Sequence, residues 1–164
     1  SYGHRNPQGL AIHPETGDIW AIEHGPQGGD ELNRVLPGLN YGWPVIGYGV
    51  NYGSGLAIHE GTRRDGIESP THFWVPSIAT SGLMIYTGDV FPAWKGSIFV
   101  GGLAGRQMAR LTMDGQRVVR EETLLQGMGR IRDIRQGPNG YIYVAIDGRG
   151  VPTSVVRLEP AGDR

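Results

Sequence analysis

The stretch GLAIHPETGDIWAIE, residues 9–23, decides the fold. It contains an apolar strand, a turn with Pro and Gly, and a second strand that begins with Ile, an aromatic residue and a small apolar residue. The stretch DIRQGPNGYIYVAID, residues 133–147, repeats this order, and FPAWKGSIFVGG, residues 91–102, repeats its second half. The recurrence indicates one β-hairpin unit that is used three times.

The spacing of these units predicts an all-β β-propeller. The Gly-x-Ile-aromatic segments begin at Gly17, Gly96 and Gly140, so the second interval is 44 residues, about the length of one four-stranded blade. The first interval, 79 residues, fits two blades or one blade with a long insertion, and the irregular region 24–74 is the expected insertion. A β-sandwich with similar hairpins is the alternative. About three blades fit in this chain, fewer than the roughly four to eight of a closed ring. We therefore expect either a part of a longer protein or a chain that pairs with another.

Other short β-rich runs support this class, and no window shows a capped 3.6-residue period. Asp-Gly within TMDGQR, residues 112–117, predicts a hairpin turn. The predicted strands cover residues 10–13, 18–22, 82–86, 97–100, 108–113, 117–120, 131–135, 141–146 and 154–158.

Composition excludes several classes of protein. The formal net charge is −1 without a basic block, which argues against nucleic-acid binding. Cysteine is absent, so disulfides, thiolate metal sites and Cys nucleophiles are excluded. The apolar runs are too short to span a bilayer. The chain shows no signal peptide and does not begin with Met, so we expect a mature, trimmed or truncated product.

The segment HGPQGGDELNRVLPGLNYGWP, residues 24–44, combines irregular backbone with the acidic pair Asp30 and Glu31. Calcium takes six to eight oxygen ligands, including backbone carbonyls that a glycine-rich loop can turn inward. The spacing is not that of an EF-hand. The alternative is a solvated turn with a surface acidic pair.

Two further clusters carry arginine. SYGHRNPQG, residues 1–9, places Arg5, Asn6 and Gln8 before a strand, and the alternative is an ordinary polar loop. In GRIRDI, residues 129–134, Arg130 and Arg132 share one face of a strand, where two guanidinium groups need an anion between them. Asp133 points to the other face and would not neutralise them; a solvent-facing strand edge is the alternative.

Taken together, GHRNPQG, HGPxxxDEΦN, NYGWP and RxRD occur in an order that resembles the C-terminal part of the glucose/sorbosone dehydrogenase family, over nearly the whole chain. The resemblance implies a six-bladed propeller that uses pyrroloquinoline quinone (PQQ) and calcium to oxidise an aldose at C1 to a lactone. It implies an external electron acceptor and a bacterial periplasmic or secreted location.

The resemblance also assigns roles to residues. Gly25 and Pro26 match the positions whose carbonyls hold the cofactor calcium, and Glu31 and Tyr41 match positions of further, structural calcium. Arg5 matches a PQQ contact that also faces the reacting carbonyl, which makes it the catalytic candidate. The other matched cofactor positions are Asn6, Gln8, His24, Arg130, Arg132 and a hydroxyl at Thr80 or Ser81. The anion expected between Arg130 and Arg132 is then the cofactor.

Three departures keep alternatives open. Ala104 stands where relatives usually carry lysine, with Arg106 as a possible substitute, and His24 stands where they commonly carry Gln. The family's general-base histidine comes from an N-terminal half, so the isolated chain is expected to be inactive and to need that half or a second chain. The alternatives are a non-catalytic binding module and a half-propeller that closes as a homodimer.

Overall fold

The computed structural model describes residues 1–148 and 152–161, and the strands of these residues form three antiparallel sheets. The chain divides into two compact units, Ser1–Thr80 and Ser81–Arg164. The only helix among the described residues is the short 3₁₀ helix η1 (Pro92–Trp94). The expected all-β class is therefore confirmed.

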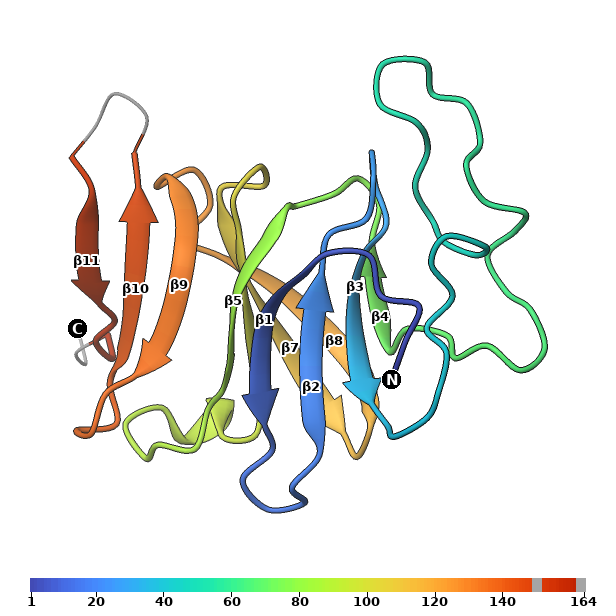
Figure 1. The fold of residues 1–164 in the computed structure, drawn as a ribbon. Coiled ribbons are helices and arrows are strands. Elements are labelled where there is room, and N and C mark those ends of the chain that lie inside the picture. Colours follow the sequence, from blue (N-terminus) through green and yellow to red (C-terminus); the bar gives the residue numbers. More distant parts are fainter. Residues whose placement is uncertain (149–151, 162–164) are drawn as a thin grey trace. The chain divides into compact units, whose positions relative to one another are not determined.

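The first unit contains one four-stranded sheet in sequential order (Figure 1). Ile19 pairs with Ile12 of the first strand and with Val35 of the third, and the first hairpin has a register shift between Pro7 and Gly9. The strands are β1 (Pro7–Ile12), β2 (Ile19–Glu23), β3 (Asp30–Val35) and β4 (His72–Trp74).

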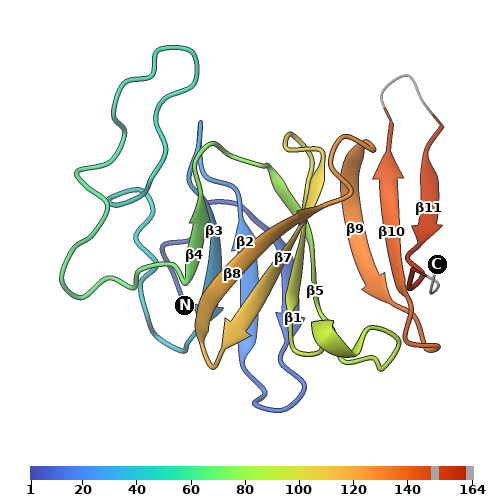
Figure 2. The same ribbon diagram turned by 180° about the vertical axis from the view of Figure 1, so that it is seen from behind.

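The expected insertion at 24–74 is only partly irregular. Residues 30–35 form β3, which pairs with the whole of β2, and residues 72–74 form β4, which pairs with β3. The long connection is therefore residues 36–71, which form isolated bridges but no regular strand (Figure 2). The sequence pattern did not reveal β3 because its DELNRV stretch carries four polar residues in six positions.

The second unit contains the other two sheets. One sheet has the order β5-β6-β7-β8, beginning at the boundary residue Thr80, and the other has the order β11-β10-β9 (Figure 1). These strands are β5 (Thr80–Ile85), β6 (Ile98–Gly102), β7 (Gln107–Asp114), β8 (Arg117–Leu124), β9 (Arg130–Gln136), β10 (Ile142–Asp147) and β11 (Ser154–Arg157). Each of the nine predicted strands overlaps one of the observed strands.

The repeat seen in the sequence has a structural basis. Gly17, Gly96 and Gly140 each lie just before the second strand of a sheet, with φ of 75°, 78° and 79°. This left-handed conformation is the one that glycine adopts without steric cost. The Asp-Gly prediction is also confirmed, because Asp114 pairs with Arg117 across the hairpin between β7 and β8.

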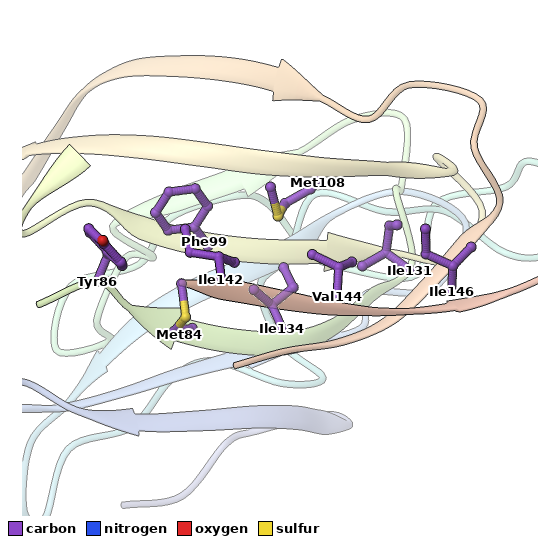
Figure 3. Packing of buried hydrophobic residues seen from close by; sticks show 9 residues of the cluster. All are labelled: Met84, Tyr86, Phe99, Met108, Ile131, Ile134, Ile142, Val144 and Ile146. Carbon is purple, nitrogen blue, oxygen red and sulfur yellow. The ribbon is translucent and has the colours of Figure 1, made fainter. Parts of the chain in front are cut away.

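The core of the second unit packs between its two sheets (Figure 3). Phe99 of β6 is fully buried and lies near Tyr86 and Trp94 in an aromatic group. Ile131 and Ile134 of β9 are both buried although they are three residues apart, because the register of β9 and β10 shifts at Ala145 and Ile146. The buried cluster is Met84, Tyr86, Phe99, Met108, Ile131, Ile134, Ile142, Val144 and Ile146.

Candidate functional site

The turn from β2 to β3, residues 24–29, borders a pocket within the first unit. The pocket brings together six of the residues singled out in the sequence, from the N-terminal segment, this turn, β3 and the long connection. These six are Arg5, His24, Gly25, Pro26, Glu31 and Tyr41, and the other lining residues are Glu23, Gly29, Trp43, Ile46, Gly47, Tyr48 and His59.

Arg5 is held at the edge of this pocket with part of its guanidinium unused. Its Nη1 donates to the carbonyl of His24 at 3.0 Å. Its Cζ lies 5.2 Å from the centre of the Trp43 ring, within the range of a cation–π interaction. Its Nε is buried and has no hydrogen-bond partner among the described residues. A buried unpaired donor is costly, so an acceptor from a bound molecule would stabilise it.

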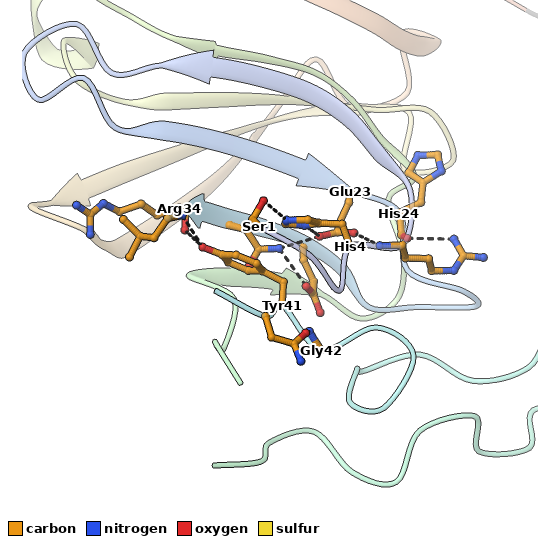
Figure 4. Close-up of polar contacts among 12 residues, drawn as sticks. Ser1, His4, Glu23, His24, Arg34, Tyr41 and Gly42 are labelled. Carbon is orange, nitrogen blue, oxygen red and sulfur yellow. Dashed lines mark hydrogen bonds and ion pairs between the residues drawn. The ribbon is translucent and has the colours of Figure 1, made fainter. Parts of the chain in front are cut away.

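Glu23, at the end of β2, fixes the segment that carries Arg5 (Figure 4). Its side chain is almost fully buried, and one carboxylate oxygen contacts His4 Nδ1 and Asn33 Nδ2 at 3.0 Å each. The other oxygen accepts the backbone N–H of Arg5 at 2.5 Å. His4 also stacks on Tyr41 with ring centres 4.6 Å apart. These contacts place Arg5 through its own backbone.

The turn is so tight that two of its positions require glycine. A Cβ at Gly25 would lie 2.2 Å from the carbonyl oxygen of Gly28, and a Cβ at Gly29 would lie 2.7 Å from the backbone nitrogen of Gly49. Both distances are shorter than real Cβ contacts, and the neighbouring atoms are backbone. The sequence HGPQGG therefore encodes a folded turn with closely packed carbonyls.

Glu31 is a carboxylate in a buried, acidic environment. Burial raises its pKa to about 7; the Asn33 amide opposes this rise, while the neighbouring carboxylates Glu23 and Asp30 add to it. Asn33 Nδ2 donates to Glu31 Oε2 at 3.1 Å, and Asn33 Oδ1 is buried without a partner among the described residues. A cation here would relieve the repulsion among these carboxylates.

Tyr41 is buried, and its hydroxyl is fully engaged with the backbone. The hydroxyl donates to the carbonyl of Arg34 at 2.6 Å and accepts the N–H of Leu36 at 2.8 Å (Figure 4). Burial raises the pKa of Tyr41, so the hydroxyl stays protonated at neutral pH. With its hydroxyl engaged in this way, the backbone carbonyl is the group that Tyr41 would offer to a cation.

The remaining candidates of the first unit have different placements. Asn6 and Gln8 are exposed beside the start of β1 and bond to each other, and they do not line the pocket. Thr80 is fully buried, and its Oγ1 has no partner among the described residues. The ring of His24 points to Thr80, with Nε2 2.6 Å from the carbonyl oxygen of that residue. Because a carbonyl only accepts, this Nε2 carries the proton.

Arg130 and Arg132 lie on β9 in the second unit, and they share an internal counter-ion. Arg132 donates from Nε and Nη2 to Asp147 Oδ2 at 3.0 and 2.8 Å, and Arg130 Nε lies 3.8 Å from the same oxygen. The expectation that the pair lacks a protein anion is therefore wrong, because the shifted register of β9 and β10 brings Asp147 opposite Arg130. Asp133 instead accepts a hydrogen bond from Arg135.

A second pocket surrounds Arg130 and includes Ala104, the position at which the family resemblance led us to expect a lysine. It is lined by Leu103, Ala104, Arg106, Gly129, Arg130, Asp147 and Gly148. Arg106 does reach this pocket, but its Nη2 donates to the carbonyl of Gly127 at 3.0 Å. Arg130 Nε is buried without a hydrogen-bond partner in the described part of the chain. Arg106 thus supplies positive charge close to Ala104 from a different backbone position.

Sequence reasoning missed Glu23 and Trp43, and it left Asp30 without a role. The available signal was a charged residue at the end of the apolar run IWAI, and another at the start of DELN, flanking the glycine-rich turn.

Within residues 1–148 and 152–161, no three His, Asp or Glu side chains form a metal-holding group, so carbonyl ligands would have to contribute. No helix of the described residues could cross a membrane.

Comparison with known proteins places these features in a family. The family model described as Glucose / Sorbosone dehydrogenase matches residues 1–154. The aldose sugar dehydrogenase YliI of Escherichia coli is 44% identical over 150 residues, which cover 90% of this chain and 40% of that protein.

Two solved structures are similar to the chain. A glucose dehydrogenase crystal structure superposes with a TM-score of 0.90 at 49% identity, over 97% of this chain and 46% of that one. The PQQ-bound aldose sugar dehydrogenase of Streptomyces coelicolor superposes with a TM-score of 0.73 at 27% identity, over 96% of this chain and 44% of that one.

The chain spans less than half the length of these relatives. Its sheets are blades of a β-propeller of which the chain covers a part. Sequence match and fold agree: the chain belongs to the glucose/sorbosone dehydrogenase family.

Proposed function

We propose that the protein containing this chain is a PQQ- and calcium-dependent dehydrogenase that oxidises the C1 hydroxyl of an aldose to a lactone. The observation that carries this proposal is the pocket of the first unit, where the unpaired Nε of Arg5 lies beside the tight Gly25–Pro26 turn. The PQQ-bound relative from Streptomyces coelicolor supports the choice of cofactor. An electron acceptor completes the reaction, and we propose a periplasmic or secreted location.

The residues present fit such a cofactor. Glycine at position 25 allows the turn to fold tightly, because a Cβ there would collide with the Gly28 carbonyl, and backbone carbonyls are ligands that calcium accepts. In the first unit, the buried Arg5 Nε and the buried hydroxyl of Thr80 lack hydrogen-bond partners in the described part of the chain, and a polycarboxylate quinone offers acceptors for such groups. PQQ would supply the two-electron redox chemistry.

Each residue then has a physical task. Gly25 and Pro26 would hold calcium through their carbonyls, and Arg5 would stabilise negative charge that develops on an oxygen in the pocket. Glu31, with Tyr41 through its carbonyl, would bind further calcium. Arg130, Arg132, Thr80, His24, Asn6 and Gln8 are proposed cofactor contacts, the last two from exposed positions.

Sugar-dependent dye reduction by the purified full-length protein tests this function. We expect activity that requires both PQQ and calcium and falls at least about tenfold in Arg5→Ala, because an electrostatic donor is removed. Arg63→Ala, an exposed arginine on the long connection, is the control and should leave the rate unchanged. Activity without PQQ, or an unaffected Arg5→Ala variant, would reject the assignment.

A non-catalytic binding module is the second candidate. The observation in its favour is Ala104, which places a methyl group in the Arg130 pocket where relatives usually carry lysine. This candidate predicts no sugar-dependent dye reduction in the PQQ-loaded full-length protein.

A further inference from the structure

Asp30 is a buried carboxylate that the proposed chemistry does not use. Its side chain is fully buried at the start of β3. It accepts hydrogen bonds from the backbone N–H of Gly25 at 3.1 Å and of Thr80 at 3.3 Å. The hydroxyl of Ser77 lies 2.8 and 2.7 Å from its two oxygens. These donors come from the turn at 24–29 and from the entry to β5, so Asp30 ties two chain segments together.

The bond to Gly25 fixes one particular peptide group. The N–H of Gly25 and the carbonyl of His24 belong to the same planar trans peptide and point in opposite directions. Asp30 accepts a hydrogen bond from this N–H, and Arg5 Nη1 donates one to this carbonyl at 3.0 Å. Rotation of this peptide would break both bonds, so the orientation of the turn and the position of the Arg5 guanidinium are coupled.

The contacts close into a ring. Asp30 accepts the Thr80 N–H, the Thr80 carbonyl accepts Nε2–H of His24, and His24 is followed by the Gly25 N–H that returns to Asp30. The Ser77 hydroxyl also accepts the N–H of Ala79, whose φ is 54°, and so fixes the bend before Thr80. Hydrogen bonds to an ionised acceptor are stronger than neutral ones, which makes the carboxylate the organising group.

We propose that Asp30 is a positioning residue. Its carboxylate fixes the orientation of the His24–Gly25 peptide and of the Thr80 backbone. In this way it holds Arg5 and the Gly25–Pro26 carbonyls in their binding positions before the cofactor arrives. The proposal rests on the proposed function. The energetic reason is that a flexible glycine turn would otherwise lose conformational entropy when it binds a ligand, and preorganisation removes that cost before binding.

Asp30→Asn in the full-length protein is the direct test. The amide keeps the shape of the side chain but replaces one oxygen by an NH₂ donor, and the Gly25 and Thr80 N–H groups bond to different oxygens, so one of them loses its acceptor. We expect the calcium-dependent PQQ affinity to fall at least about tenfold, together with kcat, while KM for sugar changes less. The control is Asp18→Asn, because Asp18 bonds Arg34 at the opposite end of β2 and touches none of these groups.

Two further variants separate positioning from folding. Ser77→Ala removes one donor and leaves the carboxylate, so we expect a smaller loss of PQQ affinity, about threefold. In an Arg5→Ala background, Asp30→Asn should lower kcat by less than about threefold, because the two residues act on one peptide.

The outcomes are distinct. If the unsubstituted protein does not bind PQQ, the proposed function fails, and the role of Asp30 fails with it. If the unsubstituted protein binds PQQ and Asp30→Asn matches its affinity and kcat within twofold, only the positioning role is overturned. If Asp30→Asn does not fold, unchanged PQQ affinity in Ser77→Ala overturns the role instead.

Discussion

Glu31 should make the metal-free protein less stable as pH rises towards neutrality. Burial raises its pKa from 4.5 to about 7 in the folded state. Below the unfolded value, Glu31 is protonated in both states and costs nothing. Between that value and the folded pKa, Glu31 is ionised in the unfolded chain but still protonated in the folded protein. The free energy of unfolding therefore falls through this window and levels off above about pH 7.

The size of the effect follows from the two pKa values. The rise from 4.5 to about 7 corresponds to a total of about 3 kcal/mol, at about 1.4 kcal/mol per unit. Between about pH 5.5 and pH 7.5, the contribution of Glu31 changes by about 2 kcal/mol. The measured quantity is the difference between the protein and its Glu31→Gln variant, which isolates the contribution of this one carboxylate.

Urea unfolding of the full-length protein with a calcium chelator, at both pH values, measures this difference. Glu31→Gln should remove about 2 kcal/mol of the pH dependence. Glu15→Gln, an exposed glutamate in the turn between β1 and β2, should leave the dependence as it is. Calcium should restore stability at the higher pH, because it favours the ionised carboxylate. If the free energy of unfolding changes equally with pH in the protein and in Glu31→Gln, this reasoning is refuted.

Three other substitutions test the fold and the site. Phe99→Ala should cost about 3–5 kcal/mol in urea unfolding, because a fully buried ring leaves a cavity, whereas Val119→Ala at an exposed position of β8 should cost little; equal losses would contradict the core assignment. Tyr41→Phe should cost about 1–2 kcal/mol, since two partly buried backbone groups lose their partner, and an unchanged unfolding midpoint would contradict this. Gly25→Ala should abolish calcium-dependent PQQ binding, because the Cβ would lie 2.2 Å from a backbone oxygen, and retained affinity would show that the turn is not the binding element.

The sequence was most informative where a local rule sets the structure. Turn glycines with positive φ and the Ile-aromatic pairs that follow them are local signals, so Gly17, Gly96 and Gly140 marked the second strand of each sheet. The polar strand β3 was missed, because its pairing with β2 makes it a strand and its own pattern does not.

For the candidate site as well, sequence motifs identified some residues, whereas other contacts could be found only in the structure. Arg5, Gly25 and Glu31 could be named from motifs, and they do line one pocket. The roles of the carboxylates that organise this pocket could not be predicted, since Glu23 and Asp30 bond to backbone N–H groups that no sequence pattern displays. The pairing of Arg132 with Asp147 depends on a shift of register between two strands, which the sequence does not reveal.

The central claim is that the protein containing this chain binds PQQ through calcium. A titration of the full-length protein with PQQ, followed by quinone absorbance, tests it most directly when it is run with calcium and again with chelator. The account predicts saturable binding that requires calcium and is abolished by chelator. Arg5→Ala should weaken this binding, and Gly25→Ala should abolish it. Absence of saturable binding with calcium present, or equal binding in chelator, would contradict it.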